Sequence, residues 1–154
     1  MLKSALECAQ ELLEIRLHGH PARQDAYHLI ARIRLKYSSY QSIEEAVDCL
    51  YVAITYIHAL PRRRLQYTIA TLHLLNHASM RNPSEQLMSN RVLHIYTLAI
   101  ELLPLAANYG LTNALRLHEL SKSSELCGPA AIHAISCNQL HLATQLLEEG
   151  NAVF

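Results

Sequence analysis

The chain has 154 residues, of which 51% are hydrophobic and 17% are charged, so it is long enough to bury a core of its own. Thirteen basic residues balance thirteen acidic ones, which removes the electrostatic attraction that binding to nucleic acids or acidic membranes depends on. We therefore expect one domain over residues 1–154, with neither nucleic acid nor membrane as a partner.

Two further features of the sequence bear on the cellular compartment in which the protein is found. The four cysteines form no C-x-x-C pair and lack the spacing of a secreted disulfide framework. The chain start runs directly into an amphipathic segment with Glu7, Glu11 and Glu14, unlike a signal peptide, and no apolar run reaches the ~20 residues that span a bilayer. These features predict a cytoplasmic protein with reduced thiols.

Apolar residues recur at the helical spacing of three and four, and no segment alternates with the period of a strand. Helices are predicted over residues 4–17, 22–37, 42–57, 62–79, 84–108, 112–121, 129–137 and 139–149. Ser42 and Glu45 are expected to form the capping box of the third helix. The apolar stripes are Ala26, Ile30, Ile33 and Tyr37 in the second helix and Met88, Val92, Ile95, Ala99, Leu102, Leu103 and Ala106 in the fifth.

The last two helices form a predicted hairpin. Gly128-Pro129 is expected to start the first of them, because proline suits the first helical position. Asn138 is expected to end the first of these helices and to cap the start of the second. In the second, Ala143, Leu147 and Gly150 share one face, so a neighbouring backbone can approach closely at both ends while the leucine fills the middle.

An internal repeat of about 41 residues relates the first hairpin to the second. Ala5, Cys8, Leu12 and Leu13 recur as Ala46, Cys49, Ala53 and Ile54, and Pro21, Arg23, Tyr27, Leu29 and Leu35 recur as Pro61, Arg63, Tyr67, Ile69 and Leu75. Such a helix-turn-helix unit cannot cover its apolar face alone and is expected to stack on the next unit.

The C-terminal third resembles the last hairpin of the tetratricopeptide arrays in fungal proteins that carry a caspase-like CHAT domain. The matching residues are Ala143, Leu147, Glu148, Gly150 and Phe154, with the upstream run Ile100, Glu101, Leu102, Leu103 and Pro104. The resemblance implies a tetratricopeptide-like array. The catalytic histidine and cysteine of that family lie in the caspase-like domain, which this sequence lacks, so a peptidase activity is not expected.

Ten histidines raise the question of metal binding or proton transfer. His73 and His77 lie one helical turn apart, but the glutamate of the zincin motif and a nearby third ligand are missing, so we expect no metal. His133 and Cys137 have the spacing of a contact pair on a helix, yet packing explains them equally and no catalytic residue is assigned.

The composition excludes terpene synthases of the usual diphosphate-ionising kind and does not favour nucleotide chemistry. The only aspartates are Asp25 and Asp48, so an Asp-rich magnesium motif is impossible, and the four glycines form no phosphate-binding loop. We therefore expect no cofactor.

Together these features predict an all-α fold of about eight helices, with antiparallel helical hairpins stacked as a short tetratricopeptide-like superhelix. The expected function is a protein-interaction scaffold that binds a peptide, or a second copy as a homodimer, through its concave face. The residues expected at the binding surface are His28, Arg63, Tyr67, His73, His77 and Tyr96. The alternative is a small cofactor-free enzyme or carrier of cyclase or isomerase type, with an enclosed apolar pocket lined by His and Tyr.

Overall fold

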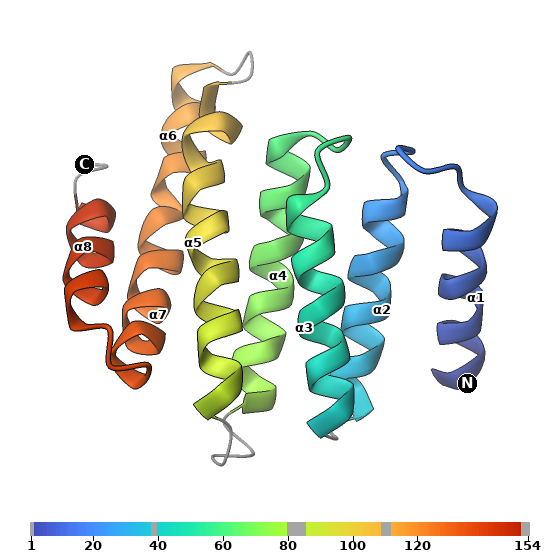
Figure 1. The fold of residues 1–154 in the computed structure, drawn as a ribbon. Coiled ribbons are helices and arrows are strands. Elements are labelled where there is room, and N and C mark those ends of the chain that lie inside the picture. The colour runs from blue at the N-terminus through green and yellow to red at the C-terminus, as the bar shows by residue number, and fades with distance from the viewer. Residues whose placement is uncertain (1, 38–39, 80–85, 109–111, 152–154) are drawn as a thin grey trace. The chain divides into compact units, whose positions relative to one another are not determined.

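The computed structural model describes the backbone of residues 2–37, 40–79, 86–108 and 112–151. Over these residues the chain forms eight α-helices and no strand (Figure 1). They are α1 (Leu2–Ile15), α2 (Arg23–Tyr37), α3 (Tyr40–Thr55), α4 (Pro61–Ser79), α5 (Gln86–Asn108), α6 (Asn113–Ser121), α7 (Ser123–Ser136) and α8 (Leu140–Asn151). Paired helices run antiparallel in hairpins, as α1 with α2 and α7 with α8, so the predicted all-α hairpin fold is confirmed.

The chain divides into two compact units, Met1–Pro83 with α1 to α4 and Ser84–Phe154 with α5 to α8. Each unit is described by itself below. The expectations of one domain over residues 1–154 and of a superhelix stay predictions.

In the first unit α2 is the central helix, because it packs against α1, α3 and α4. The predicted stripe of α2 is confirmed, since Ala26, Ile30 and Ile33 are buried; the side chain of Tyr37 lies outside the described residues. On α3 the fully buried residues are Ile43, Ala46, Val47, Leu50, Ala53 and Ile54.

Two arginines cap the ends of α1 and α3 in the same way. The Nη1 of Arg23, at the start of α2, donates to the carbonyls of Leu13 and Arg16. The Nε of Arg64, near the start of α4, donates to the carbonyl of Ile54 at 2.6 Å. The last carbonyls of a helix have no partner within it, so each hairpin uses an arginine of its second helix to satisfy the end of its first.

The predicted start of α3 is wrong. The helix includes Tyr40, so Ser42 lies in the first turn instead of at the N-cap. Glu45, the other half of the predicted capping box, contacts Arg34 of α2 at 2.9 Å and accepts a hydrogen bond from Gln41. Glu45 therefore joins α3 to α2.

In the second unit α5 packs against α6 and α7, and α7 packs against α8. The predicted stripe of α5 is confirmed, because Val92, Ile95, Ala99, Leu102, Leu103 and Ala106 are all buried. Met88 belongs to the same stripe, but its side chain lies outside the described residues. Pro104 lies inside α5, as expected.

The start of α7 differs from the prediction. The helix begins at Ser123, directly after Lys122, so Pro129 lies inside it. Gly128 explains how the helix continues, since a residue without Cβ avoids the clash with the following proline ring. The N–H that Pro129 lacks would have bonded the carbonyl of Glu125.

Asn138 ends α7 as expected. It adopts the left-handed conformation with φ 58, and the next N–H, of Gln139, donates to the carbonyl of Ala134 at 2.8 Å. This is the hydrogen-bond pattern of a helix that ends through a left-handed residue.

The packed face of α8 is not the predicted one. Ala143 is buried as expected, but Leu147 is 48% exposed, and Leu146 is the buried leucine. The start of α6 is confirmed, because the Thr112 hydroxyl accepts a hydrogen bond from the N–H of Leu115. Other predicted features lie outside the described residues: the restart at 82–85, the end at 109–110 and Phe154.

Candidate functional site

Three of the predicted site residues meet between α2 and α4. The His28 ring is buried and lies 5.0 Å from the Tyr67 ring, centroid to centroid, at an interplanar angle of 36°. His28 Nδ1 is 3.2 Å from Thr71 Oγ1, and that hydroxyl donates to the carbonyl of Tyr67 at 2.9 Å. Burial, followed by the charge of Arg32, lowers the pKa of His28 to about 3, so the imidazole is neutral at physiological pH.

The third predicted residue, Arg63, covers the outer side of this cluster. Its guanidinium lies 5.7 Å from the centroid of the Tyr67 ring, and its Nη2 donates to Asp25 Oδ2 at 2.7 Å. The ion pair ties the start of α4 to the start of α2. His28 Nε2 and Asp25 Oδ1 are buried and have no hydrogen-bond partner among the described residues. The other contacts of the cluster join its members to one another, so we interpret it as packing between two helices, with Arg63 and Tyr67 as its exposed edge.

The other predicted residues do not join this cluster among the described side chains. His73 is exposed on α4, and the side chain of His77 lies outside the described residues. Tyr96 belongs to the second unit, where it is 2% exposed and its ring lies 5.6 Å from that of His133. Burial lowers the pKa of His133.

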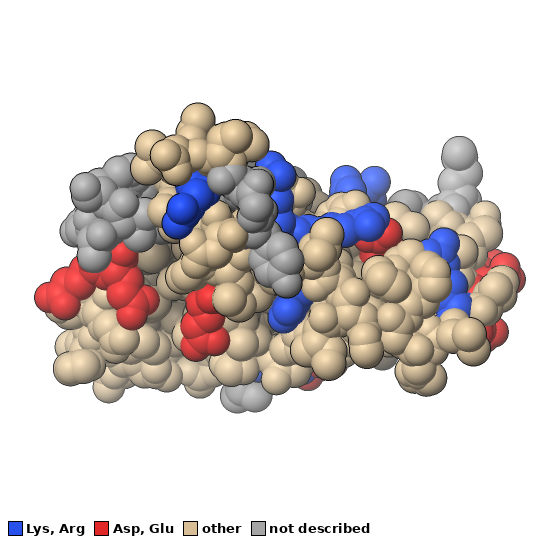
Figure 2. Space-filling model, turned by 90° about the horizontal axis from the view of Figure 1, so that it is seen from above, with Lys and Arg blue, Asp and Glu red and all other residues tan. Residues whose placement is uncertain are grey.

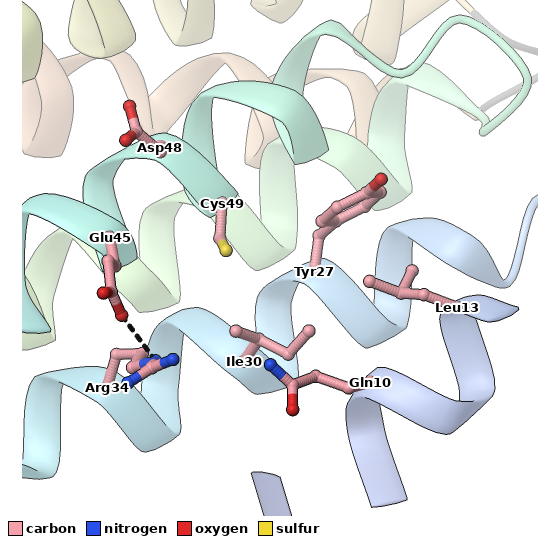
Figure 3. A pocket seen from close by; sticks show the side chains of 8 residues that line it. All are labelled: Gln10, Leu13, Tyr27, Ile30, Arg34, Glu45, Asp48 and Cys49. Carbon is pink, nitrogen blue, oxygen red and sulfur yellow. Dashed lines mark ion pairs between the residues drawn. The ribbon is translucent and has the colours of Figure 1, made fainter. Parts of the chain in front are cut away.

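The sequence did not predict a hollow in the first unit. A groove of about 330 Å³ lies over α2, between α1 and α3, and is open to solvent (Figure 3). Gln10 and Leu13 of α1 form one wall, and Glu45, Asp48 and Cys49 of α3 form the other. Tyr27, Ile30 and Arg34 of α2 form the floor. We call this hollow the α1–α3 groove.

The α1–α3 groove has an apolar part and a charged part. In Figure 3 Leu13 and Tyr27 lie at one end, Ile30 lies in the middle, and the Arg34–Glu45 ion pair lies at the other end. The Cys49 side chain points between them. Burial raises the pKa of Cys49 more than the charge of Arg34 lowers it, so the thiol stays protonated and acts as an apolar lining group, not a nucleophile.

The sequence repeat gave part of the information that locates this groove. The repeat placed Cys8 and Cys49 in equivalent positions, yet Cys8 is exposed, whereas Cys49 is half-buried and lines the α1–α3 groove. The difference arises because α3 is covered by α2 and α4, whereas α1 packs on α2 alone within the first unit. A groove between successive helices depends on their separation, and periodicity does not encode that distance.

A second feature is an apolar surface at the loops of the first unit. Leu17 and Ile57, each followed by a histidine, are 84% and 79% exposed, and Ile15 and Leu60 are also exposed. The Tyr56 hydroxyl joins the two loops, accepting from the N–H of Gly19 and donating to the carbonyl of His20, both at 3.1 Å. We call Ile15, Leu17, Ile57 and Leu60 the loop patch.

Charged side chains are sparse on the face of the protein that Figure 2 shows. In Figure 2 most of the visible face is covered by uncharged side chains, and the charged ones form small separate groups. This agrees with a charged fraction of 17%. Within the part of the chain that the structure describes, no helix is long and apolar enough to cross a bilayer.

The described residues offer little for metal or nucleophilic chemistry. Among them, no three His, Cys, Asp or Glu side chains lie close enough to hold a metal ion. Burial, followed by the charge of Glu149, raises the pKa of Cys127, which disfavours the thiolate that a nucleophile requires.

Three comparisons with known proteins were made on this chain. No protein-family model matches the sequence, and searches of curated proteins and of solved structures gave no significant match.

Proposed function

We propose that the chain is a protein-interaction module of helical hairpins that binds a peptide segment of a partner in the α1–α3 groove. The observation that carries the proposal is the groove itself: about 330 Å³ between two helices that both pack on α2. Its volume is at the lower end of the roughly 300–1,000 Å³ of ligand sites, which suits one or two side chains of a peptide.

The chemistry of the groove supports a peptide over a reacting substrate. Its eight lining residues include one tyrosine and no histidine, and its thiol is held protonated. An apolar floor beside polar walls is what an anchored peptide side chain needs, since burial supplies affinity and the walls fix orientation. The resemblance to the arrays that precede CHAT domains supports the same kind of role.

A random peptide library displayed on phage tests this function. The wild-type chain is the bait, and the variant Gln10→Trp, which fills the groove from an exposed position on α1, is used for counter-selection. Gln66→Trp on α4 is the matched control, because it adds the same side chain at an exposed position that does not line the groove.

The expected result is a set of peptides that bind wild type and Gln66→Trp but not Gln10→Trp. Cys49→Phe, which fills the groove from α3, should lose the same peptides while its circular dichroism spectrum stays that of wild type. Peptides that bind all four proteins equally would contradict the proposal.

Self-association is a second candidate function, and the loop patch favours it. Leu17, Ile57 and Leu60 are exposed on two loops that the Tyr56 hydroxyl holds together, and Ile15 is exposed at the end of α1. Exposed aliphatic groups gathered in this way favour contact with another apolar surface. Sedimentation equilibrium should then show a dimer that the double variant Leu17→Ser and Ile57→Ser abolishes; a strict monomer at high concentration would contradict it.

The enzyme or carrier alternative is supported less. Its expected elements are a histidine and a tyrosine as proton donor and acceptor, and His28 and Tyr67 do lie together. However, the His28 ring is buried and neutral, and its neighbours are the packed side chains of α2 and α4. Native mass spectrometry of the protein purified from its own host would favour this alternative if a small molecule were retained.

A further inference from the structure

We infer that α1 pairs with α1 of a second copy of the chain, antiparallel and about a twofold axis. The contact surface is an apolar stripe along α1 that consists of Ala5, Cys8, Leu12 and Ile15. We call it the α1 stripe. The inference rests on the self-association proposed above and names the surface and the symmetry of that contact.

The α1 stripe is exposed, although it is apolar. Its members are separated by three, four and three residues, which places them on one side of the helix. The two small members are exposed, Leu12 is 38% exposed and Ile15 is 77% exposed. A different side of α1 packs on α2, because Ala9 is buried and Leu13 is half-buried. Within the described residues, α2 therefore covers one apolar side of α1 and leaves the other exposed.

The corresponding stripe of α3 is covered. Through the internal repeat, the first three members of the α1 stripe correspond to Ala46, Cys49 and Ala53. Both alanines are buried, and Cys49, one helical turn from each, lines the groove whose floor is α2. This side of α3 is therefore turned toward the preceding hairpin.

The α1 stripe has no such hairpin to pack on within the first unit, where α1 lies at the edge, next to α2 (Figure 1). The terminal unit of a helical repeat normally has a polar outer side, which keeps the array soluble. The outer side of α1 is apolar instead, so we expect another surface to cover it.

The order of small and large residues along the α1 stripe fits a second copy. Two small residues come first and two large ones follow. When two such helices run antiparallel about an axis at the level of residue 10, Ala5 meets Ile15 of the second copy and Cys8 meets its Leu12. Each layer then joins one small and one large side chain, which keeps the helices evenly separated and closely packed. A parallel pair would set Ala5 against Ala5 and Ile15 against Ile15, so its separation would change along the helix.

The α1 stripe continues into the loop patch, because Ile15 belongs to both. An extended chain exposes ~1.45 Å² per dalton, so a fully exposed leucine or isoleucine has about 160 Å². Scaled by their exposed fractions, Leu12 and the residues of the loop patch offer roughly 550 Å² on each copy. Specific interfaces begin at about 600 Å² per partner. Together with the two small residues of the stripe, the surface reaches the size that a reversible dimer needs.

The pairing leaves the α1–α3 groove accessible. Gln10 lines the groove and lies midway between Ala5 and Ile15 in the sequence. At 3.6 residues per turn its side chain lies about 180° around the helix from the centre of the α1 stripe. A peptide in the groove and a second copy on the stripe therefore contact opposite sides of α1, and Gln10→Trp should dimerise like wild type.

Glu11 gives a test of this register. It is exposed, borders the α1 stripe and lies one residue beyond the level of the twofold axis. In the antiparallel pair the two copies of Glu11 therefore lie beside each other, as residues that flank the seam of a coiled coil do. Like charges weaken the pair slightly at this point, and opposite charges should strengthen it.

The experiment is a charge swap followed by fluorescence-detected sedimentation equilibrium. Wild type labelled at its C-terminus is mixed with unlabelled wild type or with unlabelled Glu11→Lys, and Glu11→Lys is also measured alone. Glu7→Lys is the matched control, because it makes the same charge change at an exposed position of α1 that does not border the α1 stripe. Leu12→Ser removes one large member of the stripe, and circular dichroism checks that each variant keeps the helical content of wild type.

Wild type and Glu11→Lys should dimerise with each other roughly threefold to tenfold more tightly than either does alone, since exposed charge pairs contribute little each. Added salt should reduce this preference. The mixture with Glu7→Lys should show no comparable preference. Leu12→Ser should weaken the wild-type dimer by roughly tenfold through the loss of apolar contact.

The outcomes separate this inference from the self-association on which it rests. A wild-type dimer that Leu17→Ser with Ile57→Ser abolishes, but that neither Leu12→Ser nor the charge swap alters, would overturn the pairing of α1 and leave self-association through the loop patch standing. An equal preference for Glu7→Lys and Glu11→Lys would overturn the register in the same way. A strict monomer at high concentration would overturn both.

Discussion

The side-chain amide of Gln24 is fully buried. At the equivalent position of the α3–α4 hairpin the residue is a leucine. Gln24 follows the capping Arg23, as Leu65 follows the capping Arg64, and both side chains are 0% exposed. Neither the amide nitrogen nor the oxygen of Gln24 has a hydrogen-bond partner among the described residues. A buried polar group without a partner costs about 1–3 kcal/mol.

Gln24→Leu should therefore stabilise the protein. The expected gain in the free energy of unfolding is about 1–2 kcal/mol, because the substitution removes the desolvated amide and keeps the side chain close to the same size. Urea unfolding followed by circular dichroism measures it. The reciprocal variant Leu65→Gln should lose stability; a loss in Gln24→Leu would show that the amide has a partner in solution.

His28 gives the stability of the protein a pH dependence. Burial lowers its pKa from 6.5 to about 3, so between these values the unfolded chain binds a proton that the folded chain does not. Stability is then complete above pH 6.5 and falls as the pH drops toward 3, with a slope of up to about 1.4 kcal/mol per pH unit.

Urea unfolding of wild type and His28→Gln between pH 7.5 and pH 4 tests this dependence. The variant should lose stability less steeply with acid, because glutamine does not titrate. His73→Gln is the matched control, since His73 is exposed, and it should follow wild type. A wild-type curve parallel to that of His28→Gln would contradict the burial of a neutral imidazole.

At the scale of elements, the arginine caps hold each hairpin of the first unit together. Arg23 is buried and bonds two carbonyls at the end of α1, and Arg64 bonds one at the end of α3. Hydrogen bonds from a charged donor contribute about 1.5–3 kcal/mol each. Arg23→Met should therefore cost at least about 2 kcal/mol in thermal or urea unfolding, and Arg64→Met somewhat less.

Lys36→Met is the control for these two variants, because it removes an exposed positive charge from α2 and should change stability little. If both arginine variants behaved like Lys36→Met, the caps would contribute nothing to the hairpins.

The packed face of α8 gives a second test at this scale. Leu146 is 2% exposed and Leu147 is 48% exposed. Leu146→Ala should cost about 2–5 kcal/mol through the cavity it leaves, and Leu147→Ala should cost well under 1 kcal/mol. A larger cost for Leu147→Ala than for Leu146→Ala would mean that α8 packs in the orientation that the sequence pattern indicated.

These elements show what a sequence pattern can predict. Periodicity identified all eight helices and the buried stripe of α5, because burial of one face follows directly from helical spacing. It placed the start of α3 wrongly, because the helix already includes Tyr40, and it did not predict the contact of Glu45 with Arg34 of another helix. It also aligned Arg23 with Arg63, whereas the shared contact to a helix end pairs Arg23 with Arg64.

The same limit applies to the candidate site. Residue type indicated His28, Arg63 and Tyr67, and the structure brings these three together between α2 and α4. It did not indicate the α1–α3 groove, because Leu13, Ile30 and Cys49 are ordinary core-type residues in the sequence. Their exposure to a hollow depends on how far α1 lies from α3.

At the scale of the whole molecule, the account assigns different surfaces of the first unit to different contacts. The groove between α1 and α3 takes a peptide, and the loop patch at the ends of these helices takes another apolar surface. Any binding experiment has to distinguish binding in the groove from binding at the loop patch, since an exposed loop patch can also attract an apolar peptide.

Methyl NMR of the protein with a peptide from the phage selection makes this separation most directly. The account predicts that the largest shift changes fall on the methyl groups of Ile30 and Leu13, inside the groove, and that those of Leu17 and Ile57 stay nearly unchanged. Shift changes concentrated at Leu17 and Ile57, with Ile30 unaffected, would contradict the assignment of the α1–α3 groove as the peptide-binding site.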